Sequence, residues 1–225
     1  MSWHAKPSGG YSAGSIEIQD NIIEAHNQLG QHGYTLEAQA GILGNAYHES
    51  GMNPWRWQND VVDQLYGGYG LLQYTASTSA ATDRYIQVCS TLSYYAPNMS
   101  VSFITAGALP TDAICQLNVF ITDYLNKWYA PLWRSYWPED ATLRAKCNAI
   151  LSRYGTGSSL TQAQFSRITN VEDATIAFLG CFEGPAIPNY TVRVNTALQI
   201  YAFLSTLSSK NKMPVWMMCR PPWKR

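Results

Sequence analysis

Apolar residues recur at helical spacing along most of this chain. Between residues 15 and 33 the large aliphatic residues fall on one helical face, and glycines at positions 30 and 33 end the pattern. Thr35 is placed as the N-cap of a second helix that runs to about Ser50, where Gly51 and Pro54 stop it. The same spacing predicts further helices over residues 79–88, 112–129, 140–154, 171–183 and 192–207. Asn170 is the expected N-cap of the helix over 171–183.

These elements predict a mostly α fold built as one domain. Strand signals are few, and a minor β-hairpin is expected over residues 94–108. Residues 1–14 are rich in Gly, Ser and Pro and are expected to form an arm or linker. The domain would then occupy residues 15–207, and residues 208–225 would form an irregular tail. A chain of 225 residues is long enough for one large core.

Composition and charge remove several classes of function. The chain has 15 Lys+Arg and 15 Asp+Glu, so it lacks the basic excess that binding to a phosphate backbone requires. Aromatic residues make up 13% of the chain, which excludes global disorder. No apolar run approaches the ~20 residues of a membrane span, and the first residues do not form a secretory signal. The five cysteines are scattered and contain no C-x-x-C pair, so we expect buried thiols and no structural metal.

One acidic side chain interrupts the apolar stripe of the second predicted helix. On a wheel of about 100° per residue, Glu49 falls under Ile42 after nearly two full turns. A lone carboxyl group there is expected to be partly desolvated, and the negative end of the helix dipole also favours its protonated form. Such a group is suited to donate a proton near neutral pH. The alternative is a structural Glu49 that satisfies a nearby N–H group or arginine.

The residues around Glu49 offer the side chains that a sugar requires. Asn45 lies one helical turn before Glu49 and is placed to hold its carboxyl group. Trp55 and Trp57 follow the helix, and glycines at positions 67, 68 and 70 allow the backbone to approach a ligand closely. Sugar rings stack on aromatic side chains, and their hydroxyls bond amides and carboxylates. The pattern therefore indicates a glycoside site.

Three blocks of sequence follow one another in a specific order and spacing. They read AGILGN at 40–45 with ESG at 49–51 and NP at 53–54, then GYGLLQY at 68–74, then AF at 177–178 with FEGP at 182–185. Together they resemble the phage tail lysozyme family, the peptidoglycan-degrading tail domains of the lysozyme and lytic transglycosylase superfamily. The resemblance covers roughly residues 16–207. Two positions depart from the family pattern: Tyr74, where Trp is frequent, and Gly184, where Arg is frequent.

This resemblance implies a lysozyme-like fold and cleavage of the β-1,4 bond between N-acetylmuramic acid and N-acetylglucosamine. It makes Glu49 the general acid and places Gln73 near it on the floor of a cleft. No metal or organic cofactor is implied. The expected partners are bacterial peptidoglycan and other tail proteins, in a virion tail whose components are made in the host cytoplasm without a signal peptide. Residues expected to contact sugar or water are Asn45, Trp55, Trp57, Tyr69, Gln73 and Tyr74.

A second catalytic carboxylate has three candidates. Asp60 and Asp63 lie in the loop after Glu49, where lysozymes often carry their second acid. Glu183 repeats the position of Glu49, because it falls under an apolar residue near the end of a predicted helix. No second acid is needed in a lytic transglycosylase, where one glutamate acts as acid and then base and a 1,6-anhydro sugar is released. The sequence leaves both outcomes open.

Other functional patterns in the chain are weaker. Residues 10–14 match G-x-S-x-G but lack the preceding buried strand of a nucleophile elbow. All four histidines precede Cys89, the reverse of the order in Cys/His cell-wall peptidases, and no H-E-x-x-H zinc motif occurs. An endolysin, a conjugation-related wall hydrolase and a non-catalytic wall-binding module would share the lysozyme pattern. Glu49 favours an enzyme, because an unpaired acid on an apolar stripe is costly.

Overall fold

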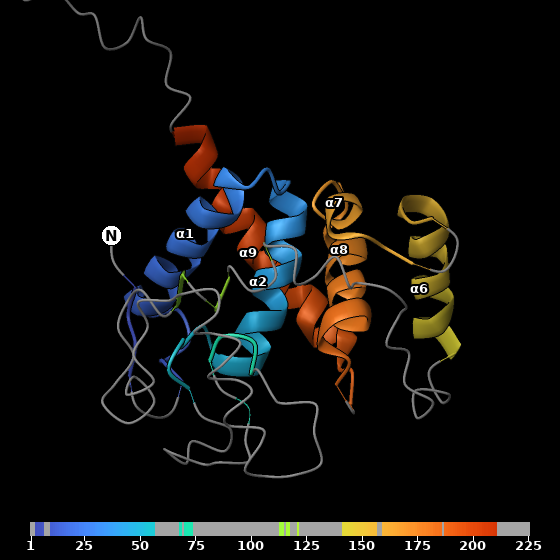
Figure 1. Ribbon diagram of the computed structural model, residues 1–225. Helices are drawn as coiled ribbons and strands as arrows, with labels where there is room; N and C mark the ends of the chain where they lie inside the picture. Colours follow the sequence, from blue (N-terminus) through green and yellow to red (C-terminus); the bar gives the residue numbers. More distant parts are fainter. Residues whose placement is uncertain are drawn as a thin grey trace, which may run out of the picture.

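A computed structural model describes residues 3–6, 10–56, 68, 70–73, 113–114, 116–117, 121, 141–156, 159–185 and 187–210. The described residues are mostly helical, which confirms the predicted mostly α fold class. Figure 1 shows α2 near the middle of the molecule, with α1 on one side, α8 on the other and α6 beyond α8. The elements are α1 (Ile16–Gln31), α2 (Leu36–Ser50), α6 (Ala141–Tyr154), α7 (Gln162–Phe165), α8 (Val171–Phe178), the π-helix η3 (Leu179–Glu183) and α9 (Tyr190–Lys210).

Side-chain caps set where these helices begin. The Thr35 hydroxyl accepts a hydrogen bond from the Ala38 N–H at 3.1 Å, and the Asn170 side chain accepts one from Asp173 at 2.9 Å. Both residues are the N-caps that the sequence predicts. Gly51 ends α2 in the left-handed conformation, with φ of 63°. The predicted boundaries of α2 are thereby confirmed, because local capping chemistry determines them.

The central helix α2 packs most extensively against α9 and α8. Gly41 and Gly44 make this packing close. A Cβ at Gly41 would lie 2.7 Å from the Ala174 backbone in α8, and one at Gly44 would lie 2.7 Å from the Ala197 Cβ in α9. Nine consecutive residues of α2, from position 38 to position 46, are buried. α2 is therefore a core helix with neighbours around it rather than an amphipathic surface helix.

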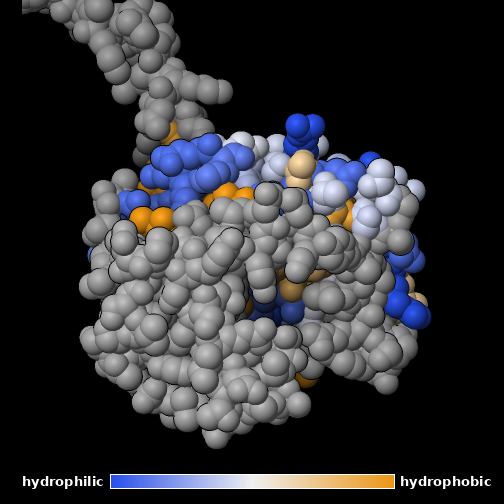
Figure 2. Space-filling model, in the orientation of Figure 1, coloured by the Kyte–Doolittle hydropathy of each residue, from blue (hydrophilic) through white to orange (hydrophobic). Residues whose placement is uncertain are grey.

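The described surface is largely polar where it can be viewed. In Figure 2 the described residues along the upper edge are mainly hydrophilic, with smaller hydrophobic areas between them. Many large aliphatic side chains of the predicted stripes are instead buried, among them Ile22, Leu29, Ile42 and Leu43, although Ile16 at the start of α1 is 63% exposed. No helix in the described ranges is long and apolar enough to span a membrane.

The predicted helix over 171–183 consists of two segments. It is α-helical to Phe178 and continues as a π-turn from Leu179 to Glu183. Gly184 ends the turn with φ of 50°, and its N–H bonds the Leu179 carbonyl at 2.8 Å. A π-turn holds more residues per turn than an α-helix, so a wheel drawn at α-helical spacing does not give the direction of Glu183.

The beginning of the chain lies against the domain. Trp3 is 6% exposed and belongs to the main apolar core. Asn21 in α1 accepts a hydrogen bond from the His4 N–H at 2.7 Å and donates to the His4 carbonyl at 2.9 Å. Asn53 pairs with the Lys6 backbone in the same way, at 3.2 and 3.0 Å. Residues 3–6 are thus bound by side chains, although the composition of this segment predicts an arm or linker.

Several predicted elements can be compared with the structure only in part, because the structure describes only some of their residues. α6 agrees with the predicted helix over 140–154 in all of its described residues, and α9 is longer than predicted at both ends. Positions 113, 114, 116, 117 and 121 are helical, within the predicted helix over 112–129. The hairpin expected over 94–108 and the helix expected over 79–88 lie outside the described residues. The short helix α7, whose N-terminus is closed by a Thr161–Gln164 capping box, was not predicted.

Candidate active site

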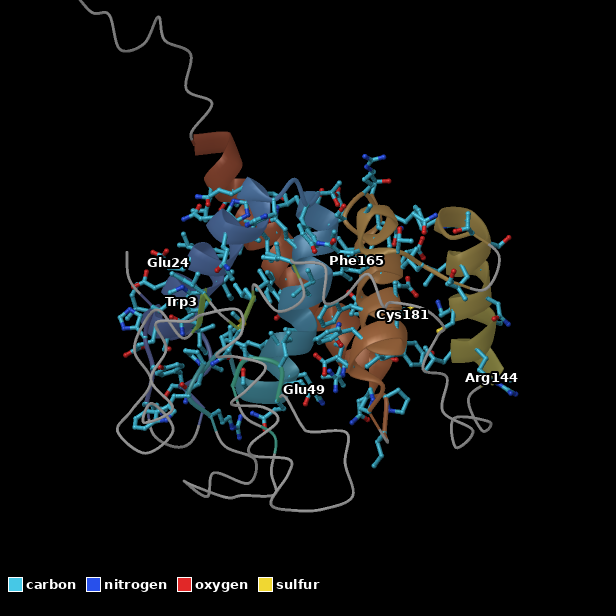
Figure 3. The ribbon with its side chains drawn as sticks, in the orientation of Figure 1. Trp3, Glu24, Glu49, Arg144, Phe165 and Cys181 are labelled. Atoms are coloured by element: carbon cyan, nitrogen blue, oxygen red, sulfur yellow. The ribbon has the colours of Figure 1, made fainter. Side chains whose placement is uncertain are left out.

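Glu49 lies in the last turn of α2, at the lower end of that helix in Figure 3. Its side chain is 20% exposed, so most of it is covered while part of it still reaches solvent. The Arg193 Nη2 donates to the Glu49 Oε1 at 2.5 Å. Glu49 is therefore not the isolated acid that the helical wheel alone indicates. An arginine from α9, 144 residues further along the chain, accompanies it.

Arg193 is a buried cation with three separate hydrogen-bond acceptors. It is only 2% exposed. Besides Glu49, it donates from Nη1 to the Asn45 Oδ1 at 3.0 Å and from Nε to the Pro188 carbonyl at 3.1 Å. These contacts use both arms and the base of the guanidinium plane, so the group has a defined orientation. Arg193 consequently fixes the position of the Glu49 carboxylate relative to α9.

Asn45 acts on Glu49 through Arg193. Its side-chain amide donates to the Gly41 carbonyl at 2.8 Å and to the Thr175 carbonyl at 3.1 Å, while its oxygen accepts from Arg193. Asn45 is fully buried. It therefore does not face a sugar, which corrects the expectation that it binds substrate. Instead it links α2, α8 and α9 beneath the carboxyl group.

Glu183 reaches the same place from the π-turn. Its Oε1 is buried and has no hydrogen-bond partner among the residues that the structure describes. Burial raises the pKa of Glu183 well above its usual range, the negative charge of Glu49 raises it further, and Arg193 offsets part of this effect. Glu183 therefore lies within electrostatic range of both Glu49 and Arg193. The Glu183 side chain as a whole is only partly buried, and the π-turn rather than α-helical spacing sets its direction.

The glycine-rich block forms a tight loop beside the segment that follows α2. The Gly70 N–H donates to the Arg56 carbonyl at 2.9 Å, and the Gln73 Nε2 donates to the carbonyls of Arg56 and Gly70 at 3.1 and 3.0 Å. Gln73 has φ of 47°, a left-handed conformation that is unusual for a residue with a side chain. These hydrogen bonds hold it there. Gln73 therefore shapes this loop with its amide nitrogen.

Gln116 holds the same loop from the other side. Its Oε1 accepts from the Leu71 N–H at 2.7 Å, and its Nε2 donates to the Pro54 carbonyl at 2.7 Å. A Cβ at Gly70, where φ is 83°, would lie 2.3 Å from this Oε1. The glycine is needed there both for its backbone conformation and for the close approach of Gln116. Sequence reasoning missed Gln116, since a polar residue inside a predicted helix carries no distinguishing local signal.

The remaining predicted site residues divide into two groups. Trp55 is partly buried, its backbone N–H donates to the Asn53 side chain at 3.1 Å, and its Nε1 is buried without a partner among the described residues. The others lie outside the described residues, namely Trp57, Asp60, Asp63, Tyr69 and Tyr74. Within the described ranges no group of three His, Cys, Asp or Glu side chains is arranged to hold a metal ion.

Arg193 was also missed, although the sequence contains a signal for it. Arg193 precedes Ala197, Ile200 and Leu204 at spacings of four, three and four residues, and all three are buried. Like Glu49 on the apolar face of α2, Arg193 is a charged residue on the apolar face of its helix. Comparison with known protein families gives a match that covers most of the chain. The family described as phage tail lysozyme matches residues 20–204.

Proposed function

We propose a reaction for this chain from one premise: it belongs to the phage tail lysozyme family. The family has a peptidoglycan-degrading, lysozyme-like function. We infer that this chain cleaves the β-1,4 bond between N-acetylmuramic acid and N-acetylglucosamine, and that it does so as part of a phage tail during passage through the cell wall. Its substrate is then bacterial peptidoglycan, and its neighbours in the particle are other tail proteins.

The single observation that carries this proposal is the position of Glu49. A general acid must reach the leaving oxygen of the substrate and must be held in a defined orientation. Glu49 ends a buried helix, is one-fifth exposed, and is oriented by Arg193. Glu49 donates the proton to the glycosidic oxygen in this proposal. Trp55 and the loop around Gln73 would then line the sugar-binding surface, because both lie in the segments that follow Glu49 in the fold.

The hydrolase and the transglycosylase differ in the step that follows protonation of the glycosidic oxygen. In a hydrolase, a second carboxylate or a held water completes the reaction, whereas a lytic transglycosylase closes a 1,6-anhydro ring without water. The buried Oε1 of Glu183 is poorly placed to activate a water that attacks the sugar. Among the acids the sequence singled out, this favours Asp60 or Asp63 as the base of a hydrolase. A transglycosylase needs neither, so it remains the second candidate.

The test is mass spectrometry of the fragments released from purified peptidoglycan. Wild type is expected to release muropeptides with reducing N-acetylmuramic acid ends, and Glu49→Gln is expected to release fewer by at least about 100-fold, because the amide cannot donate the required proton. Anhydro-muramic ends would identify a transglycosylase. Glu172→Gln is a matched control, because this partly exposed carboxylate pairs with Lys146 on the surface. It should leave the fragments unchanged.

Two outcomes would contradict the proposal. Fragments that Glu49→Gln releases as fast as wild type would remove Glu49 from the chemistry. No fragments from either protein, together with retained binding to the sedimented wall, would favour a non-catalytic wall-binding module. An endolysin would give the same fragments as a tail enzyme, so purified virions should also be probed for the protein with an antibody. Its absence from virions would contradict the tail assignment alone.

A further inference from the structure

The Glu49–Arg193–Glu183 cluster raises a question of charge balance. Arg193 is permanently charged, and burying its charge without an anionic partner would be costly. One carboxylate is enough to balance one guanidinium. Two ionised carboxylates would leave a net negative charge in a largely buried site. Glu49 makes the ion pair with Arg193, while the buried Glu183 Oε1 has no hydrogen-bond partner in the described part of the chain.

The neighbouring charges do not alter this balance. From α2, His48 stands next to Glu49, and its pKa is lowered first by burial and then by Arg193, with Glu49 acting in the opposite direction. His48 is therefore mainly neutral near pH ~7. From η3 the cluster receives Glu183, and from α9 it receives Arg193. Glu49 and Arg193 are the groups whose charges act on Glu183.

We propose that Arg193 and Glu183 form a positioning pair for Glu49, in which Arg193 holds Glu49 as a carboxylate in the resting enzyme and Glu183 stores the single proton of the cluster. This inference rests on the proposed function, since it assigns a task to residues around its general acid. It also resolves a difficulty in that function. An acid catalyst needs a proton, yet the carboxyl group that faces solvent is bound to an arginine.

The proton moves within the cluster when substrate is bound. The Glu183 O–H bond breaks, the proton adds to the Glu49 carboxylate, and Glu183 becomes the anion. Arg193 then balances Glu183 instead of Glu49. One proton and one positive charge are present before and after, so the net charge of the buried site is unchanged and no outside reactant is needed. Asn45 and the Pro188 carbonyl keep the guanidinium in place while its anionic partner changes.

This arrangement predicts opposite shifts of the pH profile in two variants. The basic limb of kcat/KM reports loss of the required proton from the free enzyme. In wild type this proton leaves the cluster only when Glu183 loses it. Glu183→Gln keeps the shape of the protonated acid but stores no transferable proton, so Glu49 must be protonated from solvent beside Arg193, and the basic limb moves to lower pH. Arg193→Gln removes the cation that favours the ionised carboxylates, and the limb moves to higher pH.

The rate constants should separate positioning from folding. Arg193→Lys keeps the charge but cannot reach three acceptors at once, so we expect kcat to fall about 100-fold at nearly unchanged KM on soluble glycan strands. Arg153→Gln is the control, because Arg153 makes an exposed ion pair with Asp173 at 2.5 Å on α8. Its profile should match wild type. If Arg193→Gln does not fold, Arg193→Lys and Glu183→Gln still decide the matter, because each retains most of the buried shape.

A direct measurement does not depend on activity. Carbon-13 NMR of the free protein labelled at the glutamate carboxyl carbons should show one carboxyl that stays protonated near pH ~7, and that signal should be absent in Glu183→Gln. An ionised Glu183 in wild type would overturn the inference, even for an active enzyme. A pH profile that neither Glu183→Gln nor Arg193→Gln shifts would overturn it as well. Failure of wild type to degrade peptidoglycan would instead count against the proposed function, and the NMR result would still decide the state of Glu183.

Discussion

At the scale of single residues, polar groups inside the helical packing carry the geometry of the site. Arg193, Asn45 and Gln116 are all buried, and each bonds groups from other segments of the chain. A buried polar side chain is tolerated when its hydrogen bonds are made, and its loss leaves several partners unsatisfied. Such residues therefore act as fixed connections. They determine where Glu49 and the glycine-rich loop lie relative to the helices and segments around them.

Gln116 provides a test of this role on stability. Gln116→Met has similar length but removes both the acceptor for the Leu71 N–H and the donor to the Pro54 carbonyl. We expect the free energy of unfolding to fall by about 2–4 kcal/mol, since two buried backbone groups lose their partners. Gln199→Ala, at an exposed position of α9, should change it by less than about 0.5 kcal/mol. Chemical denaturation measures both, and equal effects of the two variants would refute the proposed connection.

At the scale of elements, the short distance between α2 and its neighbouring helices determines where the charged cluster forms. Gly41 and Gly44 let α2 approach α8 and α9, and the two helices that carry Glu49 and Arg193 are in direct contact as a result. The π-turn at the end of α8 carries the third member, Glu183, which lies within electrostatic range of both. Helix packing and one irregular turn therefore bring together groups that no single helix holds.

Gly44→Ala tests the dependence on helix separation. The new Cβ would lie 2.7 Å from the Ala197 Cβ and 3.0 Å from its Cα, so α9 must move away. We expect a loss of about 1–3 kcal/mol in stability from this overpacking, against which the gain in helix propensity of at most about 1 kcal/mol is too small. Lytic activity should fall further than the loss of folded protein explains, because the Glu49–Arg193 contact is stretched in the protein that still folds.

Gly30→Ala is the matched control for this prediction. Gly30 is exposed near the end of α1, and a Cβ there would lie 3.7 Å from the Gln39 side chain, an ordinary contact. This variant should be neutral or more stable by up to about 1 kcal/mol. Thermal unfolding and a turbidity assay on isolated cell walls compare the two. Equal stability of Gly44→Ala and Gly30→Ala would show that this contact does not limit how closely α2 and α9 pack.

At the scale of the whole molecule, the start of the chain is joined to the end of α2. Asn21 contacts His4 and also donates to the Met52 carbonyl at 2.8 Å, so it connects three segments of the chain. Trp3 belongs to the apolar core of the domain. The N-terminal residues thereby close over the side of the domain where the segment after Glu49 begins. The stability of that segment should depend on them.

Asn21→Ala should release this connection. We expect the free energy of unfolding to fall by about 2–4 kcal/mol, because three hydrogen bonds to backbone groups are lost in a buried setting. Trp3→Ala should cost about 3–5 kcal/mol through lost burial. The two losses should be less than additive in the double variant, since either change detaches the same segment. Strict additivity in denaturation experiments would contradict a shared N-terminal connection. Asn195→Ala, at an exposed position, serves as the control.

The sequence by itself determined most of the described helices and the presence of an acidic residue, Glu49, in the last turn of α2. Caps such as Thr35 and Asn170, stop signals such as Gly51, and the apolar spacing all act over a few residues, so they can be read locally. Only the tertiary structure decided what surrounds Glu49. Arg193 lies 144 residues away, and Glu183 is directed by a π-turn that breaks helical periodicity. Contacts of this kind depend on how helices pack, and the spacing of residues within one helix contains no information about its neighbour.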